Sequence, residues 1–158
     1  MNASALVRQF SADGLTMATA ESCTGGMLAS AITAIPGASN VFTHGYVTYA
    51  NAAKTQMLGV PEAMLLAHGA VSEPVARAMA EGARTRAKVD YAISITGVAG
   101  PDGGTAEKPV GTVWFGLAGP SGTQAYHKRF SGDRESVRIQ AVMFALALLA
   151  QQGQKNEQ

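Results

Sequence analysis

The amino-acid sequence predicts an α/β protein with three layers, in which helices cover both faces of a mixed sheet of about five strands. Three observations predict it. Short apolar stretches rich in β-branched residues alternate with stretches of helical spacing through most of the chain. Two strand-like segments then follow each other around a glycine-containing turn, and a long helical pattern closes the chain. With 158 residues, of which 47% are hydrophobic, 1–158 is expected to form one domain with a buried core.

The first half of the chain alternates between helical and strand-like patterns. Apolar residues three and four positions apart indicate helices, and a glycine or proline follows the expected end of each. Apolar or alternating runs with β-branched and aromatic residues indicate strands. In chain order the expected elements are helix 3–12, strand 15–20, helix 26–35, strand 41–50, and helices 51–57 and 61–67.

The second half predicts one helix, three strands and a last helix. Ser72 followed by Pro74 predicts a helix start, because serine caps a helix and proline fits its first turn. An alternating run then predicts a central strand, and two runs on either side of 119–122 predict a hairpin. The expected elements are helix 72–88, strands 90–96, 111–118 and 124–130, and helix 133–152, with a frayed tail at 153–158. The pattern leaves the strand order open.

The stretch 19–26 is the first candidate for chemistry, because an apolar strand changes there into small polar residues and then into a helix. Backbone N–H groups at a helix N-terminus lack intrahelical partners, and Gly25 and Gly26 allow a ligand to approach the backbone. A hydroxyl held in such a turn can attack a carbonyl while the N–H groups stabilise the charge on its oxygen. The alternative is that Ser22 or Thr24 is only an N-cap.

Charge and cysteine content exclude several classes of protein. The formal net charge is +1, from 12 basic and 11 acidic residues, which leaves no broad basic surface for nucleic acid or an anionic membrane. A single cysteine cannot form an internal disulfide, and no C-x-x-C or H-E-x-x-H spacing indicates a zinc site, so we expect no metal. No apolar run has the length of a membrane span, and residues 1–10 lack the apolar core of a signal peptide. A cytoplasmic protein is expected.

Two further regions carry candidate residues. Residues 97–105 are too rich in glycine for a regular element, and a loop of this length is either functional or a flexible connector. Arg134 and Arg138 share one face at the start of the last helix, where they and the free N–H groups could hold a phosphate. A solvated basic face paired with Glu135 explains the same spacing equally well.

Six motifs resemble the CinA C-terminal domain family in order and spacing, and together they extend over nearly the whole chain. They are ESCTGG at 21–26, GYVTYANAAK at 45–54, GAVSEP at 69–74, SITGVAGPDGG at 94–104, KPVGTV at 108–113 and FSGDR at 130–134. The resemblance is greatest to members that lack the additional N-terminal domain of the larger proteins. It implies a nicotinamide mononucleotide deamidase that forms nicotinate mononucleotide and ammonia without a cofactor. It also implies a homo-oligomer, most simply a dimer.

The resemblance assigns three catalytic residues. Ser22 matches the nucleophile, Lys54 the general base and Tyr49 a third member that orients the base or relays the proton. A lysine acts as a base only when its amine is largely neutral, which requires burial or nearby positive charge, for instance from Arg134 or a helix N-terminus. Without the resemblance, Tyr49 is expected to be a half-buried strand residue and Lys54 an exposed helix residue.

This mechanism also implies groups that hold the substrate. The N–H groups of 24–26, with Thr96 or Gly97, are expected to stabilise the oxyanion. A carboxylate is expected to lie near the pyridinium, and arginines or the glycine-rich loop are expected to bind the phosphate. Cys23 is a rival nucleophile, although a small buried filler is the preferred interpretation. The substrate-binding residues are then Glu21, Thr24, Gly25, Gly26, Thr96, Gly97, Arg134 and Arg138.

Two alternatives from other classes remain at the level of sequence. One is a pyridine-nucleotide-binding or regulatory module that has kept the pocket without catalysis. The other is an oligomeric interaction module associated with DNA uptake or repair, against which the balanced charge weighs.

Overall fold

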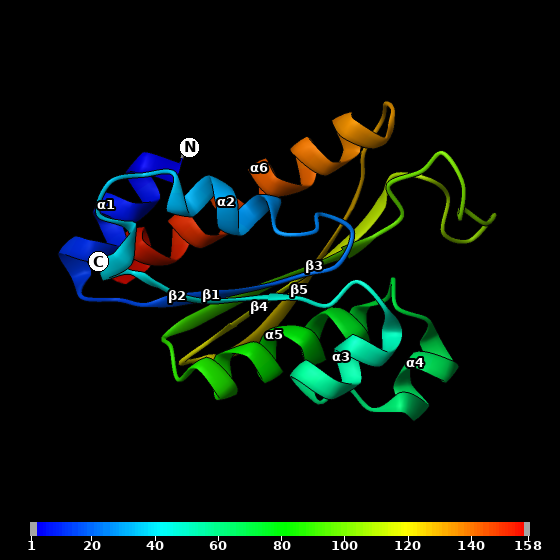
Figure 1. Cartoon of the computed structure of the whole chain (residues 1–158), viewed down its shortest axis with the longest axis horizontal. Coiled ribbons are helices and arrows are strands. Elements are labelled where there is room, and N and C mark those ends of the chain that lie inside the picture. The colour runs from blue at the N-terminus through cyan, green and yellow to red at the C-terminus, as the bar shows by residue number, and fades with distance from the viewer. Residues whose placement is uncertain (1–2, 157–158) are drawn as a thin grey trace.

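The computed structural model describes residues 3–156, which form a five-stranded mixed sheet between two layers of helices (Figure 1). The sheet order is β2-β1-β3-β4-β5, and β1 lies parallel to both β2 and β3, whereas β3, β4 and β5 are successively antiparallel. The three-layer α/β prediction is therefore confirmed, and the strand order is now defined. The strands are β1 Met17–Glu21, β2 Phe42–Val47, β3 Tyr91–Gly97, β4 Thr112–Gly119 and β5 Gly122–Arg129.

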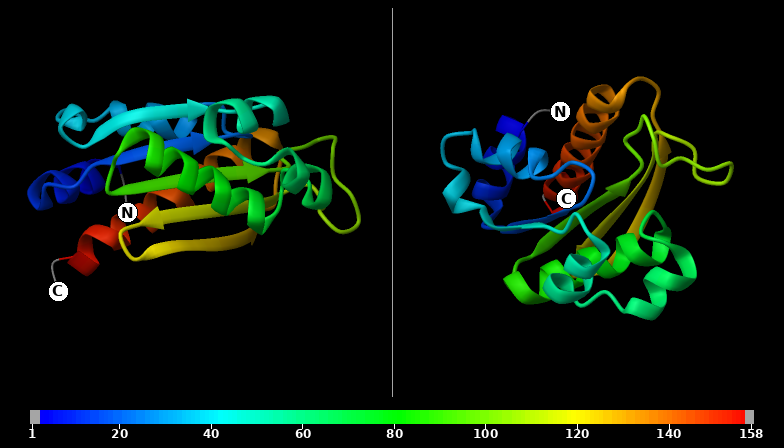
Figure 2. Two further views of the ribbon diagram at one scale, coloured as in Figure 1. Left: turned by 90° about the horizontal axis from the view of Figure 1, so that it is seen from below. Right: turned by 45° about the vertical axis from the view of Figure 1, so that its right-hand side comes forward.

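Helices cover the two faces in separate groups (Figures 1 and 2). Helices α1, α2 and α6 lie on one face of the sheet, and α3, α4 and α5 lie on the other. A 3₁₀ turn, η1, leads from the first group into β2. The bounds are α1 Ala3–Asp13, α2 Met27–Thr33, η1 Ala38–Asn40, α3 Asn51–Leu58, α4 Glu62–His68, α5 Glu73–Ala87 and α6 Arg134–Asn156.

The strand order places a topological switch point at β1. The chain leaves β1 through α2 to reach β2 on one side, then returns through α3, α4 and α5 to β3 on the other side. Right-handed crossovers in opposite directions put their helices on opposite faces, as observed. In open parallel sheets, ligands bind outside the carboxyl ends of the strands at such a reversal. Topology alone therefore points to the segment after β1.

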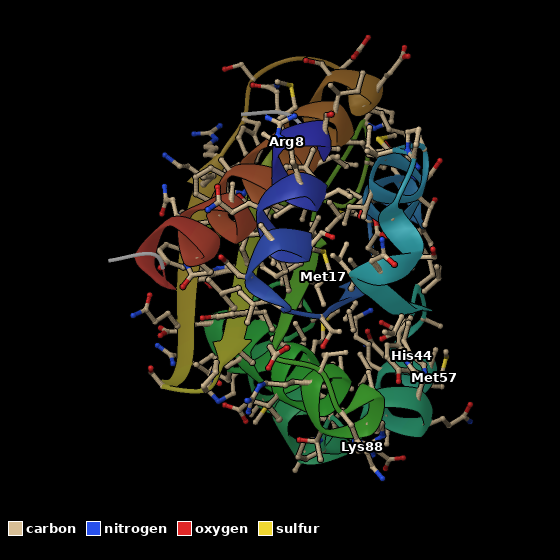
Figure 3. All side chains as sticks on the ribbon, turned by 90° about the vertical axis from the view of Figure 1, so that its left-hand side faces the viewer. Arg8, Met17, His44, Met57 and Lys88 are labelled. Carbon is tan, nitrogen blue, oxygen red and sulfur yellow. The ribbon has the colours of Figure 1, made fainter. Side chains whose placement is uncertain are left out.

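The core consists of two apolar clusters, one on each face of the sheet. Met17 is fully buried and lies between the sheet and the helices α1 and α2 (Figure 3). On the other face, Val75 and Met79 of α5 are fully buried against the sheet. Helix α5 approaches β4 so closely that a Cβ on Gly116 would lie 2.2 Å from the Ala76 carbonyl oxygen. The inward residues predicted for the last helix are also confirmed, since Val137 and others of its face are buried or half-buried.

The structure differs from the predicted elements mainly at their ends. Strand β2 stops at Val47, so Tyr49 lies beyond the strand and not at its end. Helix α6 continues to Asn156, past the expected end near residue 152, because Gly153 packs against the side chain of Gln9 of α1. The predicted helix end is therefore too early, the frayed tail stays a prediction, and residues 157–158 lie outside the described part. Within residues 3–156, no helix combines the length and the apolar character needed to cross a membrane.

Candidate active site

The carboxyl ends of the three parallel strands meet around one cavity of about 300 Å³. Ser22 follows β1 directly, Tyr49 lies between β2 and α3, and the loop from Val98 follows β3. This volume lies at the lower end of the range for small-molecule sites. The described residues that line the cavity are Ser22, Cys23, Tyr49, Asn51, Lys54, Ala70, Val71, Thr96, Gly97, Val98, Ala99, Gly100, Asp102, Gly103 and Arg134.

Ser22 and Lys54 form a direct pair at the bottom of this site. The Lys54 amine donates to Ser22 Oγ at 2.9 Å, and the same amine donates to the main-chain carbonyls of Thr48 at 2.8 Å and Tyr49 at 3.1 Å. Three acceptors therefore fix the position of the nitrogen. At 2.9 Å a neutral amine can take the serine proton directly, which is the geometry that a nucleophile and its base require.

Burial prepares the amine of Lys54 for this role. Its side chain is 1% exposed, and burial lowers the pKa of Lys54 from 10.5 to about 8, with an opposing influence from Cys23. Desolvation disfavours the charged form of a lysine because water no longer solvates the ammonium group. The alternative cause, a nearby positive charge from Arg134 or a helix N-terminus, is not what lowers this pKa. A substantial neutral fraction thus exists near physiological pH.

Tyr49 contributes its main chain, and not its hydroxyl, to the pair. Its carbonyl accepts hydrogen bonds from Lys54 and, at 3.4 Å, from Ser22 Oγ. Its side chain is 60% exposed, and its hydroxyl accepts a hydrogen bond from Arg134 at 3.1 Å. The phenol therefore belongs to the cavity wall, and the geometry does not bring it to the base as the sequence-based assignment requires.

Glu21 faces the start of α2 and does not line the cavity. It is 1% exposed, and its carboxylate accepts hydrogen bonds from the hydroxyl of Thr24 at 2.6 Å and from the N–H groups of Leu28 and Ala29. A carboxylate at this position satisfies donors that have no intrahelical partner. Glu21 is therefore absent from the cavity wall, and its expected place beside a pyridinium stays a prediction. The interpretation of Ser22 or Thr24 as the N-cap is wrong, because the N-cap of α2 is Gly26.

Arg138 is likewise turned away from the cavity, although Arg134 remains in its wall. Arg138 donates to the carbonyls of Cys23 at 3.1 Å and Thr24 at 3.2 Å. Arg134 donates to the carbonyl of Gly100 at 2.8 Å and to the hydroxyl of Tyr49. The two arginines therefore do not face the cavity together, as the phosphate-binding interpretation of their spacing requires.

The N-terminus of α6 is already capped by a carboxylate. Asp133 Oδ1 accepts a hydrogen bond from the N–H of Ser136 at 2.9 Å. A negative side chain at this position competes with a bound anion. Of the predicted phosphate-binding groups, Arg134 and the glycine-rich loop are the ones that line the cavity.

Thr96 and Gly97 do line the cavity, as expected, but each also has a packing role. The Thr96 hydroxyl donates to the carbonyl of Ala70 at 3.0 Å, and the Thr96 side chain is 1% exposed. A Cβ on Gly97 would lie 2.7 Å from Val113 Cγ2 of the neighbouring strand, so glycine is required here by strand packing. Gly25 and Gly26, in contrast, form the turn and do not line the cavity.

Cys23 lies beside Ser22, but its thiol is poorly suited to attack. Burial raises the pKa of Cys23 to about 11, and Arg138 opposes this rise in part. The thiolate is the reactive form of cysteine, and its fraction is very small at neutral pH with such a pKa. Ser22, with an adjacent base, is therefore the favoured nucleophile of the two.

Sequence reasoning missed three contributors to the site. The main-chain carbonyl of Thr48 has no sequence signal, because any residue supplies one. Asn51 at the start of α3 and Asp102 in the glycine-rich loop both line the cavity, and a polar residue next to a strand end was the available signal. Among the described residues, no group of three or more His, Cys, Asp or Glu side chains is placed to hold a metal ion.

The chain belongs to the CinA C-terminal domain family, whose family model matches residues 2–152. It is 56% identical over 146 residues to the nicotinamide-nucleotide amidohydrolase PncC of Escherichia coli K12, with 92% of this chain and 88% of that protein covered. It is also 58% identical over 144 residues to a CinA-like protein of Anaeromyxobacter dehalogenans, with 91% of this chain covered. The chain spans 35% of the length of that relative. The family resemblance seen in the sequence is thereby confirmed.

A solved structure supports the same assignment. The crystal structure of a competence-damaged protein (CinA) superfamily member from Klebsiella pneumoniae matches with a TM-score of 0.93 and 40% sequence identity. The match covers 97% of this chain and 96% of that one, so it includes the sheet, both helical layers and the site.

Proposed function

We propose that this protein is a nicotinamide-nucleotide amidohydrolase that converts nicotinamide mononucleotide to nicotinate mononucleotide and ammonia. The observation that carries the proposal is the buried Lys54 amine on Ser22 Oγ, with its pKa lowered to about 8. The name of the PncC relative supplies the substrate class. A complete nucleophile–base pair in an open cavity distinguishes this proposal from a binding module without catalysis.

The first half-reaction forms an ester on the serine. Ser22 Oγ attacks the carboxamide carbon while Lys54 takes the hydroxyl proton, and the carbonyl oxygen becomes a tetrahedral oxyanion. The C–N bond then breaks, and the proton held on Lys54 goes to the departing nitrogen. Ammonia leaves, and the nicotinoyl group remains bound to Ser22.

The second half-reaction reverses the proton transfers. The neutral Lys54 amine takes a proton from water, whose oxygen attacks the ester carbon. The bond between carbon and Ser22 Oγ breaks, and Lys54 returns the proton to the serine. The carbonyls of Thr48 and Tyr49 keep the amine in place in both halves, so the base needs no movement.

Two charged residues in the cavity wall suit the charges of the substrate. Asp102 faces the cavity and makes no ion pair within the described residues, so it can lie near the positive pyridinium ring. Arg134 presents a guanidinium that can bind the ribose phosphate, with the Tyr49 hydroxyl beside it. We assign the reaction to the cytoplasm and the protein to a homodimer, which is the commonest closed assembly. Sedimentation of the purified protein tests the dimer.

The test is production of ammonia and nicotinate mononucleotide by the purified protein, compared with Ser22→Ala and Lys54→Ala. Activity in the parent and its loss in both variants supports the proposal. An inactive parent that binds the nucleotide would instead make the protein a binding module. Full activity in Ser22→Ala would remove Ser22 as the nucleophile and bring Cys23 forward.

A further inference from the structure

The turn after Ser22 leaves two consecutive backbone N–H groups without an acceptor on another residue. The N–H of Ser22 donates to the carbonyl of Ile95 at 2.9 Å, and the N–H of Gly25 donates to the carbonyl of Ser22 at 3.1 Å. Within residues 3–156, the N–H groups of Cys23 and Thr24, which lie between them, donate to no other residue, and the N–H of Cys23 contacts only its own thiol. Successive free N–H groups in a tight turn form a concave anion-binding arrangement.

Arg138 and Gly25 determine which way these donors point. In a trans peptide, the carbonyl of one residue and the N–H of the next point in opposite directions. Arg138 holds the carbonyl of Cys23 at 3.1 Å, so the N–H of Thr24 points away from the guanidinium. The carbonyl of Ser22 is held by Gly25 inside the turn, so the N–H of Cys23 points out of the turn. Cys23 itself lines the cavity.

We propose that Arg138 is a positioning residue, which clamps the main-chain carbonyls of Cys23 and Thr24 and so holds the turn in the shape in which the N–H groups of Cys23 and Thr24 form the oxyanion site for Ser22. This inference rests on the proposed amide hydrolysis at Ser22. It gives Arg138 a role distinct from binding the substrate phosphate. The residue touches the turn, and the turn touches the reacting oxygen.

The turn is held from two sides by groups of opposite charge. Glu21 binds the hydroxyl of Thr24 and the first N–H groups of α2, whereas Arg138 binds the carbonyls of the turn from α6. Arginine suits this task because its planar fork supplies two donors in fixed geometry.

Two measurements with Arg138→Ala test the inference. The first is the steady-state kinetics of nicotinamide mononucleotide hydrolysis, where we expect kcat to fall by roughly 10²-fold with KM changed less than about twofold. The second is the rate at which a fluorophosphonate reagent labels Ser22, measured by mass spectrometry. There the serine oxygen attacks phosphorus while Lys54 takes its proton, fluoride leaves, and the phosphoryl oxygen occupies the oxyanion site, so the labelling rate should fall similarly.

Controls separate positioning from folding and from substrate binding. Ile139→Ala changes the adjacent exposed residue of α6 and should leave both readouts unchanged. Arg138→Lys keeps the charge and one donor group, and we expect it to restore about tenfold of the lost rate. If Arg138→Ala does not fold, as judged by circular dichroism, the inference is tested by comparing Arg138→Lys with the parent in the same two measurements, the kinetics and the labelling rate.

The outcomes are distinct. A higher KM with unchanged kcat and unchanged labelling would make Arg138 a substrate-binding residue and overturn the inference. Unchanged values of both readouts would overturn it as well. If the parent does not hydrolyse nicotinamide mononucleotide but its labelling depends on Arg138, the proposed substrate fails and the positioning role stands.

Discussion

Burial gives Lys54 a chemistry that an exposed lysine lacks at neutral pH. Because its pKa is lowered to about 8, Lys54 should gain a proton and stop acting as a base as the pH falls through the mildly alkaline to neutral range. We expect kcat/KM for nicotinamide mononucleotide to rise with pH and to level off above about pH 8, when Lys54 is neutral in the free enzyme. The measurement is a pH profile of kcat/KM in buffers of constant ionic strength.

Lys54→Arg provides the matched control for this profile. Arginine keeps a positive charge and hydrogen-bond donors, but it does not lose its proton in proteins. The variant should therefore be inactive across the whole range. A parent profile that is flat through pH 8, or an active Lys54→Arg, would mean that another group takes the serine proton.

Asp102 should govern preference for a positively charged substrate. Its carboxylate is exposed in the cavity wall, so its attraction to the pyridinium is screened by water and salt. Asp102→Asn should raise KM for nicotinamide mononucleotide about two- to fivefold, which is the range for an exposed charge pair, with little change in kcat. The KM of the parent should also rise more steeply with salt than that of the variant.

Glu107→Gln is the control for Asp102, because Glu107 is an exposed carboxylate of the same loop that does not line the cavity. Equal effects of the two substitutions would indicate a general loss of negative charge. A second comparison uses the reduced nucleotide, whose dihydropyridine ring carries no charge while its phosphate is unchanged. Asp102→Asn should leave its KM unchanged.

The residue types predicted the chemistry of the site well, but they predicted the positions of its side chains less well. Ser22 and Lys54 were assigned through the family motifs, and the structure brings them together. Glu21 and Arg138 were placed at the substrate because of their charge, whereas both hold the backbone of the turn. Spacing shows which residues share a helix face, but it does not show whether that face meets a ligand or a carbonyl.

At the scale of elements, periodicity and capping signals predicted the α-helices and strands of the described residues, the 3₁₀ helix η1 was missed, and the other errors lie at element ends. Periodicity arises because one face of an element is buried. This signal is weak where the element enters a loop. Strand β2 shows this, because its middle residues are exposed at the edge of the sheet. Only the alternating pattern of its aromatic and β-branched residues predicted a strand there. The extension of α6 past Gly153 depends on contact with α1, which no local pattern contains.

The capping of α2 also depends on distant structure. The carboxylate that accepts hydrogen bonds from the first N–H groups of α2 belongs to Glu21, the last residue of β1, and not to a side chain at the N-cap position. A local capping rule searches next to the helix start. Here the turn folds back, so a strand residue reaches the helix N-terminus and leaves Ser22 facing the cavity.

At the scale of the whole molecule, the buried Lys54 should reduce stability at neutral pH. In the folded state its pKa is about 8, against 10.5 for an ordinary lysine, so the unfolded chain binds the proton more tightly. Below about pH 8 both states carry the proton, and the fold bears the full desolvation penalty. Above about pH 10.5 both states are neutral, and the penalty is gone. Stability from this group therefore rises with pH between these values.

Comparison of the parent with Lys54→Met isolates this contribution, because all other titrating groups are common to both proteins. We expect the free energy of unfolding of the parent, relative to the variant, to increase between pH 8 and pH 10.5 by on the order of 3 kcal/mol. Urea denaturation of both proteins at each pH measures it. The carbonyls of Thr48 and Tyr49 lose their donor in the variant at every pH, so this loss shifts the difference by a constant and leaves its slope unchanged. A difference that does not vary with pH would show that the fold does not lower the pKa of Lys54, and the lysine would then lack the neutral fraction that its role as a base requires.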